Sequence, residues 1–257
     1  METTPLWVPT DAFKAAQPLT HFIDWCGLAR GTPFADYDAF YDWSIRDRGA
    51  FWSAVWDHCG VKGSKGSVAL TDGDEMLKAR FFPEAELNFA ENLLAHAGDG
   101  DALIFRGENK ISDRWSWQRL AAMVSRLQQA MQSMGIGTGD RVAAMMPNMP
   151  ETIALMLAAS SLGAIWSSCS PDFGEQGVLD RFGQIEPSLF IACDGYWYHG
   201  KRQEVGDKVV AVAGKLGVPV LIIPYAGDTP ALVERLPDGR SLEQFISPFS
   251  VQDIVYR

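Results

Sequence analysis

Residues Gly139 to Pro187 read GDRVAAMMPNMPETIALMLAASSLGAIWSSCSPDFGEQGVLDRFGQIEP. Arg141–Met145 is a short apolar run, which is typical of a buried strand. A helix is predicted after it, with Glu151 in the first turn and Gly163 as its stop. A second strand and a second helix follow over Ala164–Ser168 and Gly174–Ile185. This alternation predicts a βαβα unit and therefore a parallel sheet.

The segments around this unit extend the same alternation. A hairpin and a long helix are predicted before it, and strands and helices continue to alternate after it. Ser116 is the expected N-cap of the long helix, whose apolar side chains form one stripe. The predicted elements are strands Ala102–Phe105, Ile111–Trp117, Leu189–Cys193 and Val218–Ile223, and helices Trp117–Met134, Gln203–Leu216 and Ser241–Ile246. A layered α/β domain follows from this order.

The first part of the chain differs in composition. Aromatic residues recur at gaps of three and four between Tyr37 and Cys59, which predicts an amphipathic helix or a helix pair broken near Gly49. A glycine- and aspartate-rich joint follows at His96–Asp101. We therefore expect two parts, a helical leader over residues 1–97 that packs on the core and an α/β domain over residues 98–257.

Composition narrows the classes of function. The net charge is −10, with 22 Lys and Arg against 32 Asp and Glu, which argues against a nucleic-acid partner. The four cysteines have no CxxC spacing, as expected for a reducing compartment. No secretory signal pattern occurs at the N-terminus, and no apolar run is long enough to cross a bilayer. We expect a cytoplasmic protein that has no membrane partner.

Three sequence patterns suggest nucleotide, phosphate or metal binding, but the order or spacing of their residues argues against each. Gly135–Gly139 resembles a dinucleotide fingerprint, but a helix precedes it and a strand follows, the reverse of the required order. Gly60–Ser67 has Lys65 before Gly66, unlike a phosphate-binding loop. The four histidines show neither zinc-ligand nor helical spacing. No catalytic residue and no metal ligand is predicted in this chain.

Two loops that follow predicted strands are candidate binding sites, since ligands of open α/β sheets bind at the carboxyl ends of strands. The first loop contains Ser170, Pro171, Asp172 and Phe173, and its alternative role is a turn that only packs the next helix.

The second loop contains Tyr198, Gly200, Lys201 and Arg202. With a helix predicted to start at Gln203, two cations there are unfavourable unless an anion such as a phosphate lies nearby. A solvated basic turn is the alternative.

Several motifs resemble the adenylate-forming superfamily of acyl-CoA synthetases, luciferases and nonribosomal adenylation domains. GDRVAAMMPNMPE and SLGAIWSSCSP are similar to the opening core of that family. SPDFG with VLDRFGQIEP, together with the leader segments WCGLARG, RGAFWSAVWDHCG and FFPEAELNFAENLL, resembles more specifically the acetoacetyl-CoA synthetases. The resemblance spans nearly the whole chain and implies part of the layered, mostly parallel-sheet large domain of adenylate-forming enzymes.

This resemblance also implies roles for the two loops. The loop of Ser170, Pro171, Asp172 and Phe173 would border the tunnel that brings the thiol of CoA to the acyl-adenylate. Related acetyl-CoA synthetases carry glycines at Pro171 and Asp172, so the lining here is expected to differ in shape. Tyr198 and Lys201 stand where those enzymes use two arginines near the 3′-phosphate of CoA, with Gly200 and Arg202 beside them.

The implied function is that of an ATP-dependent acid–thiol ligase acting on acetoacetate, with Mg²⁺, ATP and CoA. The family's phosphate loop, of the form SSGTTGxPK, and its adenylating lysine would lie beyond Arg257, so we expect this chain alone to be inactive. Self-association through surfaces exposed by truncation is a further expectation. Two alternatives remain open: a ligase for acetate or propionate, and a non-catalytic binding or assembly module built on half of this fold.

Overall fold

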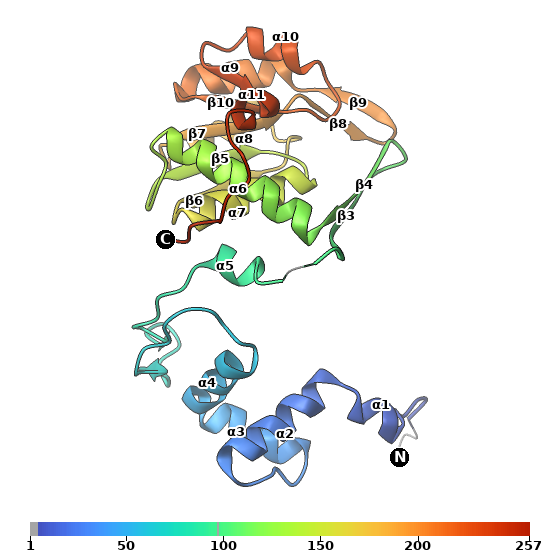
Figure 1. Cartoon of the computed structure of the whole chain (residues 1–257), viewed down its shortest axis with the longest axis vertical. Coiled ribbons are helices and arrows are strands. Elements are labelled where there is room, and N and C mark those ends of the chain that lie inside the picture. The colour runs from blue at the N-terminus through green and yellow to red at the C-terminus, as the bar shows by residue number, and fades with distance from the viewer. Residues whose placement is uncertain (1–4, 97) are drawn as a thin grey trace. The chain divides into compact units, whose positions relative to one another are not determined.

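The computed structural model describes residues 5–96 and 98–257, shown as a cartoon in Figure 1. The backbone divides into two compact units, Met1–Leu87 and Asn88–Arg257. The boundary between them therefore lies at Leu87 and Asn88, ahead of the glycine- and aspartate-rich joint.

The first unit is mainly helical. Its helices are α1 (Asp11–Ala15), α2 (Pro18–Arg30), α3 (Tyr37–Arg46) and α4 (Arg48–His58), followed by a two-stranded antiparallel ribbon of β1 (Leu70–Thr71) and β2 (Arg80–Phe81). The helix pair, one of the two predicted possibilities, is present, and it breaks at Asp47, two residues before Gly49. Asp47 ends α3 and caps α4, where its carboxylate accepts from the amide of Ala50 at 3.0 Å.

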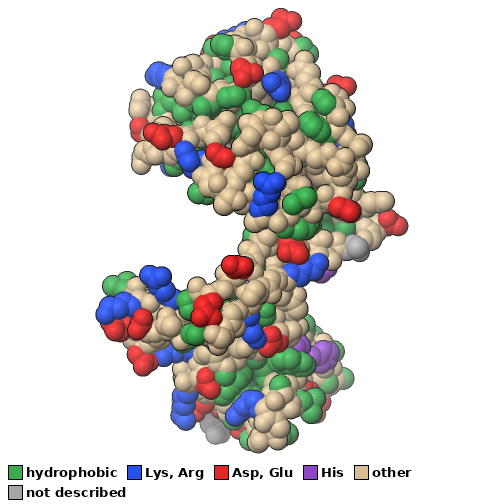
Figure 2. All heavy atoms as spheres, turned by 60° about the vertical axis from the view of Figure 1, so that its left-hand side comes forward, with side chains coloured by type: hydrophobic (Ala, Val, Ile, Leu, Met, Phe, Trp, Pro, Cys, Tyr) green, Lys and Arg blue, Asp and Glu red, His purple; other side chains and the backbone are tan. Residues whose placement is uncertain are grey.

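Aromatic rings form the interior of this helical unit. Phe22, Phe40 and Phe51 pack edge to face, with centroids 5.8 to 6.1 Å apart, and Trp43 lies against Phe40 and Phe51. Other apolar side chains stay exposed, and the space-filling view shows them as green areas among acidic and basic groups (Figure 2). The gaps of three and four between the aromatic residues thus place their rings on one side of each helix, where they contact one another.

The second unit begins earlier than the predicted joint at residue 97, which itself lies outside the described residues. Helix α5 (Phe89–Leu93) belongs to this unit because of Asn88. The Asn88 side chain accepts from the amides of Ala90 and Glu91 and donates to the carbonyl oxygens of Ser160 and Arg257, both at 2.9 Å. One buried amide therefore ties the start of the unit to its far end.

A five-stranded parallel sheet forms the centre of the second unit, in the order β11-β10-β7-β5-β6. All five residues of the central strand β7 are buried. The strands are β5 (Arg141–Met145), β6 (Ile165–Cys169), β7 (Leu189–Cys193), β10 (Val220–Ile223) and β11 (Gly239–Ser241). The predicted α/β class with a parallel sheet is confirmed, since the predicted strands over residues 141–223 recur with bounds shifted by at most two residues.

Helices cover both faces of this sheet. The step from β5 to β6 and the step from β6 back to β7 run in opposite directions, so right-handed crossovers place α7 and α8 on opposite faces. Helix α9 packs with α8, whereas α6 packs with α7 and α11. The helices are α6 (Trp117–Ser133), α7 (Pro150–Ser161), α8 (Glu175–Phe182), α9 (Gly206–Leu216), α10 (Thr229–Glu234) and α11 (Leu242–Ile246).

Two hairpins extend from this core. The first, β3 (Asp101–Gly107) with β4 (Ile111–Ser116), agrees with the sequence prediction, and Ser116 caps α6 as expected. The second, β8 (Gly195–Tyr198) with β9 (Lys201–Glu204), replaces the predicted start of a helix at Gln203. His199 and Gly200 have φ values of 49° and 72°, which is the backbone of a two-residue hairpin turn. The helix starts at Gly206 instead.

The last residues of the chain lie along α6 and are held by polar side chains. Ser125 and Gln128 are both 2 % exposed, and they bond the backbone of Gln252 and Val255 through both donor and acceptor groups. Arg126 donates to the carbonyl oxygens of Ile246 and Phe249. Side chains of α6 thus hold the extended segment over residues 252–255 by hydrogen bonds to its backbone, much as a neighbouring strand would.

None of the described helices is both long enough and apolar enough to span a membrane.

Replacement of Asn88 by Ala should lower the free energy of unfolding by about 2–4 kcal/mol. The change removes the cap of α5 and leaves carbonyl oxygens without their donor. Asn88→Ser should recover about 1 kcal/mol, because a serine also caps a helix. Urea unfolding checks both, with exposed Asn109→Ala as the control. Equal stability of Asn88→Ala and the control would contradict the role of Asn88.

Candidate functional site

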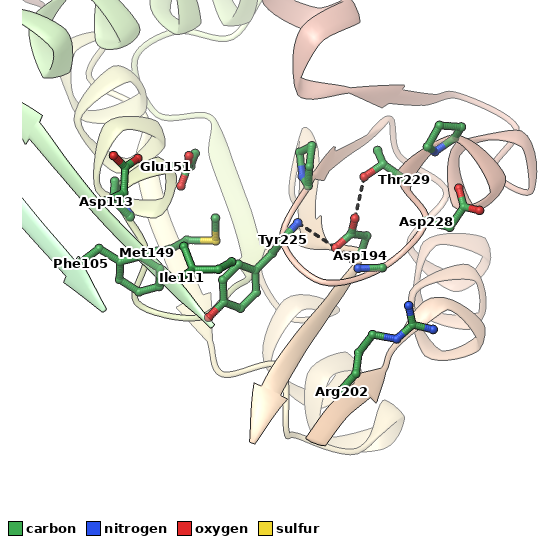
Figure 3. Close-up of a pocket in the computed structure, with 14 residues that line it drawn as sticks. Phe105, Ile111, Asp113, Met149, Glu151, Asp194, Arg202, Tyr225, Asp228 and Thr229 are labelled. Atoms are coloured by element: carbon green, nitrogen blue, oxygen red, sulfur yellow. Dashed lines mark hydrogen bonds between the residues drawn. The ribbon is translucent and has the colours of Figure 1, made fainter. Parts of the chain in front are cut away.

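A cavity of about 650 Å³ lies where the strands β5, β7 and β10 end (Figure 3). The first hairpin and the loop after β10 form its walls, so segments far apart in the sequence meet there. Its lining residues are Phe105, Ile111, Asp113, Met149, Pro150, Glu151, Asp194, Arg202, Pro224, Tyr225, Gly227, Asp228, Thr229 and Pro230. The location matches the rule that open α/β sheets bind ligands at the carboxyl ends of their strands.

Asp194, the residue directly after β7, shapes this cavity. Its carboxylate is buried and accepts three backbone N–H bonds at 2.9 Å, from Tyr225, Ala226 and Gly227. The hydroxyl of Thr229 donates to the second oxygen at 2.6 Å. Figure 3 shows the carboxylate inside the curve of the loop that follows β10. Asp194, which follows β7, therefore fixes the loop that follows the neighbouring strand β10.

Two acidic side chains, Asp113 and Glu151, lie together at one end of the cavity (Figure 3). Burial alone would raise the pKa of Asp113, but hydrogen bonds from Arg119, Trp115 and the amide of Arg114 lower it overall. The pKa of Glu151 is raised, chiefly by burial and then by the charge of Asp113. Glu151 therefore keeps its proton to a higher pH than an ordinary glutamate does.

The wall between the two hairpins is closely packed. The hydroxyl of Tyr225 lies so near Gly107 that a Cβ built there would be 2.4 Å away, so any larger residue would require the Tyr225 side chain to shift. The carboxylate of Glu108 accepts from the amide of Gly200 at 2.7 Å and joins the tips of the two hairpins. Lys110 lies 5.4 Å from the ring centroid of Trp197.

The second hairpin carries Tyr198, Gly200, Lys201 and Arg202, so the structure brings the predicted group together on one ribbon. Tyr198 pairs with Lys201 and Trp197 pairs with Arg202 across it. Because successive residues of a strand point to opposite faces, Lys201 shares a face with Tyr198, and Arg202 does not. Arg202 lines the cavity and forms an ion pair with Glu204. The alternation of faces along β9 thus places the two cations on opposite faces of a ribbon, and not in a turn before a helix as predicted.

The loop of Ser170, Pro171, Asp172 and Phe173 lies at the end of the edge strand β6. Pro171 is buried, whereas Ser170 and Asp172 are exposed. The guanidinium of Arg181 lies 4.1 Å from the ring centroid of Phe173. Lys208 donates from α9 to the carbonyl oxygens of Pro171 and Phe173, at 2.5 and 2.8 Å. Sequence reasoning misses Lys208, because no spacing along the chain links it to this loop.

Thiol chemistry at this edge is unfavourable. Burial raises the pKa of Cys169 to about 11 and the pKa of Cys193 to about 12, so both thiols stay protonated near neutral pH. All four cysteines are free. Within residues 5–96 and 98–257, no group of three or more His, Cys, Asp or Glu side chains could hold a metal ion. The carboxyl edge of the sheet therefore offers a ribbon that carries Lys201, a loop held by Lys208, and a cavity lined by Glu151, whose pKa is raised by burial.

Comparisons with known proteins agree with this architecture. The family model described as AMP-binding enzyme matches residues 89–249, and the model described as acetyl-coenzyme A synthetase N-terminus matches residues 37–93. An acetoacetyl-coenzyme A synthetase of Rhizobium meliloti is 66% identical over 98% of this chain and 39% of its own length. An acetoacetyl-CoA synthetase of Xenopus tropicalis is 36% identical over 98% of this chain and 38% of its own length.

A solved structure also matches. The acetoacetyl-CoA synthetase from Streptomyces lividans superposes with a TM-score of 0.89 at 32% identity, over 99% of this chain and 39% of that protein. The chain thus spans about two fifths of the length of the relatives it matches. Because the first family model covers more than half of the chain, and the fold and the cavity at the strand ends accord with it, the chain belongs to the AMP-binding enzyme family.

Proposed function

We propose that the protein containing this chain is an acetoacetate–CoA ligase. It would convert acetoacetate, ATP and CoA into acetoacetyl-CoA, AMP and pyrophosphate. The observation that carries the proposal is the 66% identity to the Rhizobium meliloti synthetase, which extends over 98% of the chain. Adenylation solves the chemical problem of the reaction, because a carboxylate is a poor electrophile and AMP is a good leaving group.

The contribution of this chain is part of the CoA site. The second hairpin offers Lys201 on an exposed ribbon at the carboxyl edge of an otherwise acidic protein. Tyr198, 59 % exposed, lies on the same face of the ribbon. Gly200 supplies the turn, and an incoming phosphate would have to displace Glu108 from its amide. The 3′-phosphate of CoA fits these groups, since an ammonium group binds phosphate as a point charge.

ATP and Mg²⁺ belong to the proposed reaction, but the described residues supply no cluster that could hold the metal. The resemblance assigns adenylation to a phosphate loop of the form SSGTTGxPK, which does not occur in residues 1–257, so these residues alone are expected to be inactive. The free cysteines, three of them with thiol pKa values raised by burial, suit the reducing cytoplasm that we propose as the location.

The complete protein should form acyl-CoA from acetoacetate with a kcat/KM at least about tenfold above that for acetate or propionate, the smaller acids. Coupled release of AMP and pyrophosphate measures this. A preference for acetate or propionate would favour the alternative ligase. Absence of acyl-CoA formation from all three acids would favour the binding or assembly module.

Lys201→Ala in the complete protein should abolish most of its discrimination between CoA and 3′-dephospho-CoA and raise the KM for CoA about tenfold. Arg202→Ala should preserve the discrimination, because its side chain faces the cavity and already pairs with Glu204. Arg240→Ala, a loss of charge outside the hairpin, is the control. The assignment fails if Arg202→Ala acts as Lys201→Ala does, or if neither changes the discrimination.

We also propose that residues 1–257 by themselves associate through β6, the edge strand whose Ile165 is 54 % exposed. An uncovered apolar edge favours pairing between copies. Sedimentation velocity should show a dimer or larger species, and Ile165→Lys should shift it toward the monomer. A monomeric parent chain at high concentration would contradict this.

A further inference from the structure

Lys208 links two segments of the proposed CoA site. It is the third residue of α9, and it reaches the loop after β6, more than thirty positions earlier in the chain. Its ammonium group donates to the carbonyl oxygens of Pro171 and Phe173, at 2.5 and 2.8 Å. Two carbonyl oxygens of one short loop are therefore held by a single cation.

The surroundings of Lys208 make this contact strong. The side chain is half-buried, and burial lowers its pKa, with Cys193, Asp172 and Cys169 acting in the opposite direction. The two thiols are uncharged near neutral pH because burial raises their pKa values to about 11 and 12. The carbonyl dipoles and the exposed carboxylate of Asp172 are thus the groups that compensate the ammonium charge. Hydrogen bonds to a charged donor are stronger than those between neutral groups.

The backbone that carries Lys208 is also anchored in the core. Val205 and Val209, on either side of it, are 2 % and 0 % exposed and anchor the start of α9 in the core. Helix α9 begins two residues after β9, the strand that carries Lys201. A displacement of the loop after β6 relative to the hairpin would therefore break the bonds made by Lys208.

We infer that Lys208 is a positioning residue of the CoA site, which sets the Ser170–Phe173 loop relative to the hairpin that carries Lys201. This inference rests on the proposed function. Without Lys208, the carbonyl oxygens of Pro171 and Phe173 would be free to turn toward an anionic nucleotide and repel it. The hydrogen bonds of Lys208 go to the backbone of this loop, so it should act on CoA binding and not on adenylation.

The test compares variants of the complete protein. Lys208→Met keeps the length of the side chain and removes its donors, so the KM for CoA should rise at least about tenfold with kcat changed less than threefold. Acetoacetate-dependent ATP–pyrophosphate exchange should stay within twofold of the parent. Amide hydrogen exchange should accelerate in peptides that cover residues 170–174. Lys208→Arg, which can still donate to both carbonyls, should keep the KM within about threefold of the parent.

Lys215→Met is the matched control, because Lys215 lies on the same helix in an exposed ion pair with Glu175, at 2.8 Å. It should change neither the KM for CoA nor the exchange of the loop. An unchanged KM in Lys208→Met overturns the inference, and so does an equal loss of pyrophosphate exchange in Lys208→Met and the milder Lys208→Gln, which would indicate a role in overall folding. If the parent protein itself forms no acetoacetyl-CoA, the proposed function fails, and the hydrogen-exchange result still decides whether Lys208 holds the loop.

Discussion

The buried carboxylate of Asp194 is the contact on which the carboxyl edge of the sheet depends. It follows the central strand β7 and accepts from three consecutive amides and one hydroxyl of the loop after β10. A buried charge without such donors would be strongly destabilising, so this loop has one conformation that satisfies it. That conformation places Tyr225 against the first hairpin and leaves the cavity beside it.

Buried polar side chains hold the rest of the second unit in the same way. Gln128 on α6 pairs with the backbone of Val255, and Asn88 bonds the backbone of Arg257. Such amides are costly when unpaired, so each specifies one register of the extended segment along α6. The apolar stripe of α6 explains why the helix packs, and its polar residues explain which segment lies on it.

The binding residues show where local reasoning reaches its limit. The sequence alone predicts that Lys201 and Arg202 lie in one cationic turn before a helix. A strand, three aromatic residues and a His-Gly pair can precede a helix as well as form part of a hairpin. Cross-strand pairing between Tyr196 and Gln203 favours the hairpin. That pairing separates the two cations by face, which changes the expected role of Arg202. Lys208 could not be found from the sequence at all. Its hydrogen bonds to the loop after β6 depend on how α9 packs against α8 and the end of β6.

The sequence by itself determined the α/β class, four of the five strands of the parallel sheet (β11 was not predicted), the cap of α6 and the membership suggested by its motifs, because these depend on the period of apolar residues and on local capping. It also indicated the two loops at the strand ends. The tertiary structure alone decided the limit of the second unit at Asn88, the hairpin at residues 195–204, the loop held by Lys208 and the cavity shaped by Asp194. These features rest on contacts between residues separated by up to 169 positions, and such contacts leave no periodic signal along the chain.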